Sequence, residues 1–533
     1  MPACFVGIDV GTGSARAGVF DASGRMLGAA KRDIALFHEP GAIVEQSSAD
    51  IWSAVATAVR GAVAAAGIAP AKVQGIGFDA TCSLVVLGAG GAPLPVGPSE
   101  DPARDIIVWM DHRAVAQAER INAAGADVLR YVGGTISPEM ETPKLLWLRE
   151  HRPAVFEAAW QFLDLTDFLT WKASGSLARS SCTVTCKWTY LAHERRWDGG
   201  YFRAIGLAPL ADEGFARIGE EVVDPGTALG AGLTEAAAAD LGLPPGTADA
   251  AGLIDAHAGG VGTVGALGDP TGSMGCVFGT SSCTMTTTPE PVFVPGVWGP
   301  YFSAMVPGMW LNEGGQSAAG AAIDRLVHLH PAAPSLAAQA KSQGKSLLAL
   351  LSDEAARSGP DGVAALADGL HVVPEFLGNR APFADPHARA VIAGLGMETD
   401  AASLVDLYVA GLCGIGYGLR QILETQGARG AGVERVMLSG GAGQSDLVRQ
   451  LLADAAGKPI VTVTAPEPVL LGAAILGAVA GSAQPDIPTA MAAMSSAART
   501  FTPDPETRAL HVRRFAAFER LQATARAIRE AEA

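Results

Sequence analysis

Two short turns rich in glycine, threonine and serine each join a pair of apolar segments. They are Gly11-Thr12-Gly13-Ser14, between residues 4–10 and 15–21, and Gly279-Thr280-Ser281-Ser282, inside GSMGCVFGTSSCTMTTT. Such turns present backbone N–H groups and hydroxyls without bulky side chains, which suits phosphate oxygens, although a tight hairpin favours the same residues for geometry alone. A third turn, SGGAG at 439–443, precedes an amphipathic segment, and helix N-termini attract anions. Together the three turns predict phosphate binding, but without the G-x4-G-K-[ST] motif of a P-loop protein.

Two aspartates have positions that suit phosphoryl chemistry. Asp9 lies in an apolar segment directly before the first turn, where a carboxylate is costly unless a cation or hydrogen-bond donors satisfy it. Mg²⁺ held largely through water would do so, and the alternative is a structural carboxylate that caps the hairpin. Asp255 ends the apolar run in AAGLIDAHAGG. It is placed to accept a proton from a hydroxyl that attacks a phosphoryl group, and the alternative is a helix-capping aspartate.

A run of polar residues interrupts a segment that otherwise resembles a buried strand. The stretch GFDATCSLVVL at 77–87 contains Asp79, Thr81, Cys82 and Ser83 in close succession. These groups are candidates for a small-molecule pocket, and the alternative is that they only end a strand. Asp111, His112 and Arg113 follow VWM, but one charged turn also fits a solvated loop.

The dinucleotide-binding interpretation is disfavoured. One G-x-G-x-x-G occurs at Gly260, Gly262 and Gly265, but it follows AHAG rather than a clear strand. No acidic residue lies about 20 positions beyond it, where such a fold needs one for the ribose.

The elements around these residues predict an α/β architecture. The apolar segments 4–10 and 15–21 form a strand hairpin, residues 48–67 a helix and residues 72–81 a further strand. In α/β folds, ligands bind at the carboxyl ends of the strands. The second strand–turn–strand passage lies about 265 residues after the first, which predicts two similarly built domains with a boundary in the Gly-rich stretch 259–268.

Length and composition set the broad class. A chain of 533 residues is too long to fold around a single hydrophobic core, so two large domains are expected. A net charge of −16 argues against nucleic acid or an anionic membrane as the main partner. The seven cysteines are odd in number and irregularly spaced, which indicates reduced thiols in the cytoplasm. The run VLLGAAILGAVAG at 469–481, the most membrane-like in the chain, is too short to span a bilayer and predicts a buried helix packed closely against a sheet.

The combination of motifs resembles the FGGY carbohydrate kinases, of the actin/hexokinase/Hsp70-like superfamily. It rests on GIDVGTGSARAGVFD, WMDHR, KLLWL, LIDAHAGG, GTSS and SGGAGQSDLVRQLLAD, which occur in this order from residue 5 to about 480. The resemblance implies two RNase H-like α/β domains on either side of a catalytic cleft for MgATP and a sugar. The expected domains are 1–262 with the sugar pocket and first phosphate loop, 263–485 for the nucleotide, and a 486–533 extension with a surface helix at 508–533.

The resemblance also implies residue roles. Asp255 would be the general base and Asp9 the carboxylate near Mg²⁺. The ATP and phosphate contacts it implies are Thr12, Gly13, Ser14, Arg16, Gly279, Thr280, Gly440, Gly441, Ala442 and Gln444. The substrate contacts it implies are Asp79, Thr81, Cys82, Ser83, Asp111, Arg113 and Glu139, with Asp255.

Small residues at 81–83 suit a five-carbon substrate, and TCSLV resembles the D-ribulokinase and ribitol-kinase-like branch. Phosphorylation of a pentulose is therefore expected, with D-ribulose to D-ribulose 5-phosphate the best single choice. Ribitol, L-ribulose, xylulose and glycerol remain alternatives on the same fold, and a non-catalytic ATP-binding or sugar-sensing protein is a remote one. The chain departs from the family pattern at Cys413, where an acidic residue is usual, and in the EMETP that precedes KLLW. A homodimer is also expected.

Overall fold

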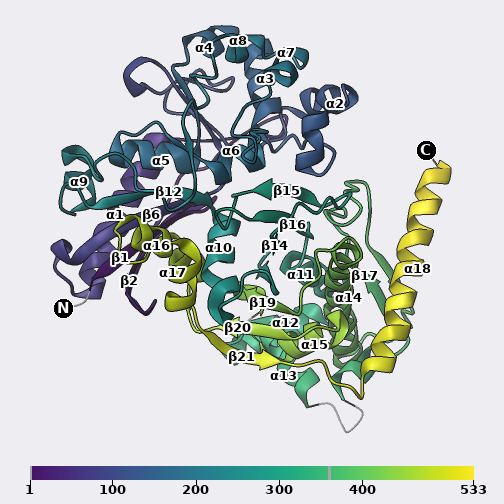
Figure 1. The fold of residues 1–533 in the computed structure, drawn as a ribbon. Coiled ribbons are helices and arrows are strands. Elements are labelled where there is room, and N and C mark those ends of the chain that lie inside the picture. Colours follow the sequence, from purple (N-terminus) through teal and green to yellow (C-terminus); the bar gives the residue numbers. More distant parts are fainter. Residues whose placement is uncertain (1–2, 358–361, 444, 533) are drawn as a thin grey trace.

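The structure is a computed structural model that describes residues 3–357, 362–443 and 445–532. Figure 1 shows two α/β lobes, one built mainly from the first half of the chain and one mainly from the second. The expected pair of α/β domains is confirmed, whereas the predicted domain boundaries stay predictions.

The first lobe contains a five-stranded sheet in the order β12-β6-β1-β2-β3. Its strands are β1 (Cys4–Val10), β2 (Ser14–Asp21), β3 (Met26–Asp33), β6 (Val73–Ala80) and β12 (Ala248–Ile254). The first three are antiparallel neighbours, whereas β6 and β12 run parallel to β1. Helix α1 (Ser48–Ala66), capped by the Ser47 side chain, buries its apolar face in the same core.

The second lobe repeats this strand order within its larger sheet, β15-β16-β14-β13-β19-β20-β21. The strands are β13 (Ser273–Phe278), β14 (Ser282–Thr288), β15 (Trp298–Phe302), β16 (Trp310–Gln316), β19 (Arg435–Ser439), β20 (Ile460–Val463) and β21 (Ala497–Phe501). As in the first sheet, an antiparallel hairpin is followed by strands that run parallel to its first member. The repeated glycine-turn hairpins seen in the sequence therefore occupy equivalent positions in two sheets.

Helix α16 (Pro468–Ala480) lies against the first sheet although it comes late in the chain, as Figure 1 shows. Glycines make this close approach possible: a Cβ on Gly7 would lie 1.8 Å from the Leu470 carbonyl oxygen, and one on Gly77 2.1 Å from that of Ala473. Because no side chain fits between them, the helix backbone packs directly on the strands. The predicted buried helix is confirmed.

Helix α10 (Asp255–Val264) begins immediately after β12 and packs on the other side of α16. A Cβ on Gly262 would lie 2.0 Å from the Pro468 carbonyl oxygen, and one on Gly472 1.9 Å from that of Ala258. The Gly-x-Gly-x-x-Gly spacing thus serves helix packing. Because α10 follows β12 directly, Asp255 lies at the carboxyl end of that strand.

A smaller sheet, in the order β4-β5-β8-β7-β9, stands beside the first. Its strands are β4 (Phe37–Glu39), β5 (Ile43–Gln46), β7 (Leu84–Leu87), β8 (Ile106–Ile107) and β9 (Gln161–Asp164). Residues 81–83 connect β6 to β7, so they lie where these two five-stranded sheets meet.

Two long helices complete the second lobe. Helix α14 (Ala401–Gly427) is long and apolar enough to cross a membrane by length and composition, but 78% of its most apolar window is buried inside the protein. This helix, rather than residues 469–481, is the most membrane-like segment, and burial explains its composition. Helix α18 (Arg508–Glu532) packs on it through Phe515 and Phe518, which stack on each other and contact the ring of Tyr417.

Candidate active site

A cavity of about 870 Å³ is lined by residues from both halves of the chain. The first half contributes the first glycine turn together with Asp9, Thr81, Cys82 and Asp255. The second half contributes residues of β13, β14 and β16 and the start of α16. Part of the predicted site therefore converges on one cleft: Asp9, Thr12, Gly13, Ser14, Arg16, Thr81, Cys82, Glu139 and Asp255 line it, at the place where ligands of α/β folds bind.

Two carboxylates sit side by side at the carboxyl ends of neighbouring parallel strands. Asp9 in β1 and Asp79 in β6 are register partners. Asp9 is 2% exposed, and its Oδ2 accepts a hydrogen bond of 2.6 Å from Arg16 Nε, across the β1–β2 hairpin. Arg16 also donates to Glu467 Oε2 at 2.8 Å, which links the first hairpin to the residue before α16. The arginine thus orders the wall around the first turn.

Asp255 stands at the first position of α10, with its side chain in the cavity wall. Its Oδ1 accepts a hydrogen bond of 2.7 Å from the N–H of Ala256. Burial, and then the negative charge of Asp9, raise the pKa of Asp255 to about 7. A carboxylate with a pKa near neutrality, at the helix start and inside a cavity, has the properties of a general base.

Trp109 links the first glycine turn to the segment that follows β6. The indole Nε1 donates to Thr12 Oγ1 at 3.0 Å, and the backbone N–H of Trp109 donates to Ser83 Oγ at 3.1 Å. Gln46 Nε2 donates to the Thr12 carbonyl oxygen at 2.8 Å. Thr12, Gly13, Ser14 and Arg16 all line the cavity.

The second glycine turn lies beside the third. A Cβ on Gly440, whose φ is +97°, would lie 2.4 Å from the carbonyl oxygen of Phe278, the residue before Gly279. The Thr280 carbonyl oxygen accepts from the N–H of Ala319 and of Ala321. Ser281 lines the cavity, whereas Gly279, Thr280, Gly440 and Gly441 are not among its lining residues. Ala442 lies within the same turn (Gly441–Gly443), and Gln444 lies outside the described residues. The contacts of these residues with ATP stay predictions.

The polar end of the cavity contains Thr81, Cys82 and Glu139 together with three charged residues that the sequence did not single out. These are Lys187, at the end of α6 (Ser181–Lys187), Glu313 in β16 and Arg380 in a loop of the second lobe. Lys187 and Glu313 are each the single charge of the helix or strand that contains them, which is the signal by which they could have been found. Arg380 has no such signal, because Glu375 and Asp385 lie close to it in the sequence.

Electrostatic pairing keeps these groups ionised. Burial opposes ionisation of Glu313, but Lys187, His257 and Arg380 hold its pKa at about 2. Glu139 likewise has a lowered pKa, because a hydrogen bond from His112 and the charges of Arg380 and Lys187 outweigh burial. Cations from two lobes thus face carboxylates in one pocket. Such a set of fixed donors and acceptors suits a polyhydroxylated ligand.

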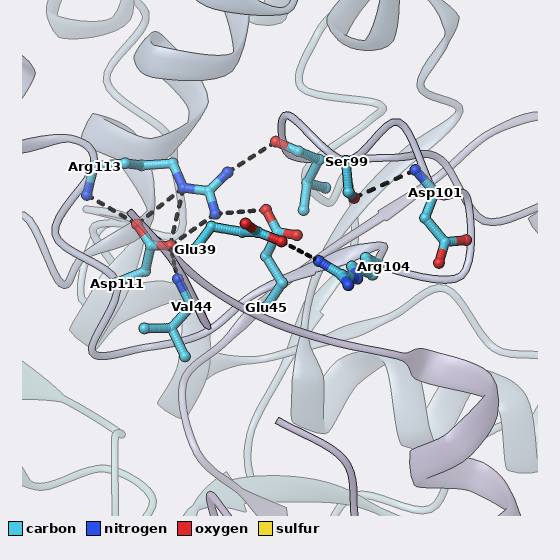
Figure 2. Close-up of polar contacts among 9 residues, drawn as sticks. Glu39, Val44, Glu45, Ser99, Asp101, Arg104, Asp111 and Arg113 are labelled. Carbon is cyan, nitrogen blue, oxygen red and sulfur yellow. Dashed lines mark hydrogen bonds and ion pairs between the residues drawn. The ribbon is translucent and has the colours of Figure 1, made fainter. Parts of the chain in front are cut away.

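Asp111 and Arg113 lie outside this cavity wall, in the buried cluster of Figure 2. Arg113 Nη2 donates to Glu45 Oε1 at 2.9 Å and to Asp111 Oδ2 at 2.7 Å. The N–H of Val44 donates to the same Asp111 oxygen at 2.7 Å, and Arg113 Nε donates to Asp111 Oδ1 at 2.9 Å. The three charged side chains are at most 1% exposed. Because the polar atoms of Asp111 and Arg113 have partners inside the protein, the arrangement favours a structural role for these two residues and does not support direct substrate contact.

Asp79 and Ser83 also lie behind the cavity rather than in its wall. Asp79 is completely buried, and within the described residues neither carboxyl oxygen has a hydrogen-bond partner. Burial and the charges of Asp9 and Asp255 raise its pKa well above the usual value. Ser83 pairs with Thr81 Oγ1 at 3.1 Å and holds Trp109. Both residues support the wall that their neighbours form.

The carboxylates fit the hydrated Mg²⁺ that the fold implies. Asp9 and Asp255 line one cavity with the first glycine turn, and the two unpartnered oxygens of Asp79 lie behind them. Within the described residues, no group of three or more His, Cys, Asp or Glu side chains forms a metal cage. Carboxylate oxygens beside a phosphate-binding turn are the kind of hard ligand that Mg²⁺ prefers.

Solved structures share this two-domain α/β fold. A xylulose kinase from Rhodospirillum rubrum matches with a TM-score of 0.82 and 22% identity, covering 98% of this chain and 99% of its own. A Plasmodium falciparum glycerol kinase solved with ADP matches with a TM-score of 0.79 and 16% identity, covering 98% of each chain.

Sequence comparisons then give the family. Residues 4–262 match the N-terminal domain, and residues 274–481 the C-terminal domain, of the FGGY family of carbohydrate kinases, and the chain belongs to this family. A human FGGY carbohydrate kinase domain-containing protein is 44% identical over 531 residues, with 97% of this chain and 96% of the relative covered. A D-ribulokinase of Saccharomyces cerevisiae is 38% identical over 515 residues, covering 89% and 72%. The resemblance to the ribulokinase-like branch is confirmed, and the protein is a sugar kinase.

Proposed function

We propose that this sugar kinase transfers the terminal phosphoryl group of ATP to D-ribulose, giving D-ribulose 5-phosphate. The observation that carries the proposal is the position of Asp255. Its carboxylate lies in the wall of a cavity that also contains the first glycine turn and the polar pocket of Cys82 and Glu139. The 38% identity to the yeast D-ribulokinase supports the choice of sugar.

In this reaction Asp255 takes the proton from the attacking sugar hydroxyl. The hydroxyl oxygen forms a bond to the terminal phosphorus while the bond from that phosphorus to the leaving ADP oxygen breaks. The pKa of about 7 leaves a large fraction of Asp255 deprotonated at neutral pH.

The remaining residues align the reactants. Thr12, Gly13 and Ser14 present hydroxyls and backbone N–H groups to the phosphates, and Asp9 would hold hydrated Mg²⁺. When bound, Mg²⁺ neutralises charge on the phosphate oxygens. Because phosphoryl transfer depends mainly on alignment and charge neutralisation, a cavity shared by two lobes is suited to it.

The pocket chemistry supports a small, polyhydroxylated acceptor. Thr81 and Cys82 are small side chains, whereas Glu139, Glu313 and Lys187 offer acceptors and donors for hydroxyl and carbonyl groups. L-ribulose, xylulose, ribitol and glycerol remain the rival acceptors on this fold. The cytoplasmic location and the homodimer also remain predictions.

Coupled-assay measurement of ADP release with this panel of acceptors tests the proposal. The highest kcat/KM is expected with D-ribulose, and phosphorus NMR of the product should show a 5-phosphate. Inactivity with every pentulose would refute the proposed function, and a preference for xylulose or L-ribulose would refute the choice of sugar.

A further inference from the structure

His257 joins side chains from the two lobes directly behind the reaction site. It lies on α10 two residues after Asp255, and its side chain is completely buried. Its Nδ1 is 3.1 Å from Sγ of Cys182, which lies on α6 of the first lobe. Its Nε2 is 3.4 Å from Oε2 of Glu313, which lies on β16 of the second lobe.

The partners of the ring fix which of its nitrogens donates to Glu313. A carboxylate oxygen can only accept, so Nε2 carries the proton that faces Glu313. On the other side, the Cys182 sulfur already accepts the N–H of Ile254 at 3.3 Å. Although burial lowers the pKa of His257, the neighbouring Cys182 and Glu313 raise it to about 10, which favours a protonated ring.

Glu313 is a buried carboxylate and the single charged residue of β16. A buried carboxylate needs a hydrogen-bond donor to remain ionised. It shares the polar end of the cavity with Lys187, Arg380 and Glu139. Within the described residues, its Oε2 is held by His257 and its Oε1 accepts no side-chain hydrogen bond. One oxygen is therefore anchored, and the other remains for a hydroxyl of the acceptor.

We propose that His257 is a positioning residue for the sugar: it anchors the Glu313 carboxylate of the second lobe against the first lobe, and Cys182 fixes the orientation of its ring. The inference rests on the proposed function, because it assigns the polar end of the cavity to the sugar. It predicts that changes at His257 act on the KM for the sugar and leave the KM for ATP unchanged.

Two substitutions of similar size separate the two faces of the ring. His257→Gln retains an amide N–H at the place of Nε2, facing Glu313, whereas His257→Asn retains a polar group only at the place of Nδ1, facing Cys182. The expected result is a sugar KM within about threefold of wild type for His257→Gln and raised about tenfold or more for His257→Asn, since one lost charged hydrogen bond corresponds to a factor of this order. His511→Asn, at a buried histidine of the second lobe outside the cavity, is the control for the general cost of losing a buried imidazole.

Glu313→Gln tests the same hydrogen bond by changing the acceptor of His257 Nε2. If His257 acts through Glu313, the effects of His257→Asn and Glu313→Gln on the sugar KM are not additive in the double variant. Additive effects, equal effects of the Gln and Asn variants, or parallel increases in the KM for ATP would each overturn the inference.

If a variant fails to fold, hydrogen exchange in the wild-type protein with isotopically labelled histidine takes its place. The Nε2 proton of His257 should then be protected from exchange. Rapid exchange of that proton would overturn the inference as well.

The wild-type acceptor panel keeps this result separate from the proposed function. If the enzyme phosphorylates xylulose or a polyol in place of D-ribulose, the choice of sugar fails. The same KM comparison then applies to the acceptor that is used, and it still decides the role of His257.

Discussion

Asp9 and Asp79 are register partners on the parallel strands β1 and β6, so two carboxyl groups are buried at one point of the first sheet. Arg16 forms an ion pair with Asp9, whereas among the residues that the structure describes no cation is bound to Asp79. The buried neighbour Asp79 therefore has a raised pKa, which makes its ionisation costly in the folded state.

Asp79→Asn is expected to gain stability relative to wild type as the pH rises. A carboxyl whose folded pKa is raised binds more protons in the folded state, so its contribution to stability falls as the pH rises above about 4, the pKa of the unfolded chain. The difference in Tm, Asn variant minus wild type, should be larger at pH 8 than at pH 5 in thermal scans. Asp33→Asn, at a carboxyl 82% exposed on β3, should show no such trend. A constant difference for Asp79→Asn would contradict the raised pKa.

Asp255→Asn should lower kcat by about 10²- to 10⁴-fold, the range for loss of a general base. The amide keeps the shape of the side chain, so calorimetric titration should still detect binding of the sugar and of the nucleotide. Asp212→Asn, at a side chain 63% exposed, is the control for an exposed aspartate. A variant with near wild-type turnover would exclude Asp255 as the base.

The pH dependence of kcat/KM should show an acid limb with an apparent pKa near 7. Asp255 must be deprotonated to accept a proton, and its pKa is raised to about 7, so activity is expected to rise between pH 5 and 8 and then level off. Steady-state rates at saturating ATP and magnesium, over pH 5–9, provide the measurement. Constant activity down to pH 5 would show that no group with this pKa is essential.

Cys82→Leu should narrow the polar end of the cavity and raise the KM for the sugar by about tenfold or more. The larger leucine side chain would clash with a bound sugar, because a packed pocket has no space for additional carbon atoms. The KM for ATP should not change, since the glycine turns lie elsewhere in the cleft. Cys82→Ala is the matched control and should remain close to wild type. Equal kinetics for the leucine and alanine variants would place Cys82 away from the sugar.

Arg113→Met should destabilise the protein strongly, by about 3–5 kcal/mol, because it leaves the Asp111 and Glu45 carboxylates buried without their partner. A clear fall in Tm is expected in thermal scans, with little change in the KM for the sugar at 25 °C. Arg120→Met removes a pair whose arginine is 57% exposed, and it should change Tm little. A large rise in sugar KM with unchanged Tm would instead favour direct substrate contact by Arg113.

Local patterns in the sequence predicted much of the fold and part of the site. The apolar segments 4–10 and 15–21 with Gly-Thr between them specify a hairpin, and the second such passage correctly indicated a repeated lobe. Asp9 and Asp255 were identified because a charge at the end of an apolar strand is locally unusual. These features depend on neighbours in sequence, so they can be read without tertiary contacts.

Other site residues depend on contacts between distant segments. Lys187, Glu313 and Arg380 lie far apart in the chain and meet only because both lobes contribute to one cavity. Conversely, Asp111 and Arg113 resembled ligand-binding residues in sequence, but folding places Glu45 beside them and uses up their hydrogen bonds. The sequence by itself determined the element types, the hairpin turns and the candidate base. Tertiary structure decided which charges face the cavity, because burial and pairing depend on packing between segments that local periodicity does not specify.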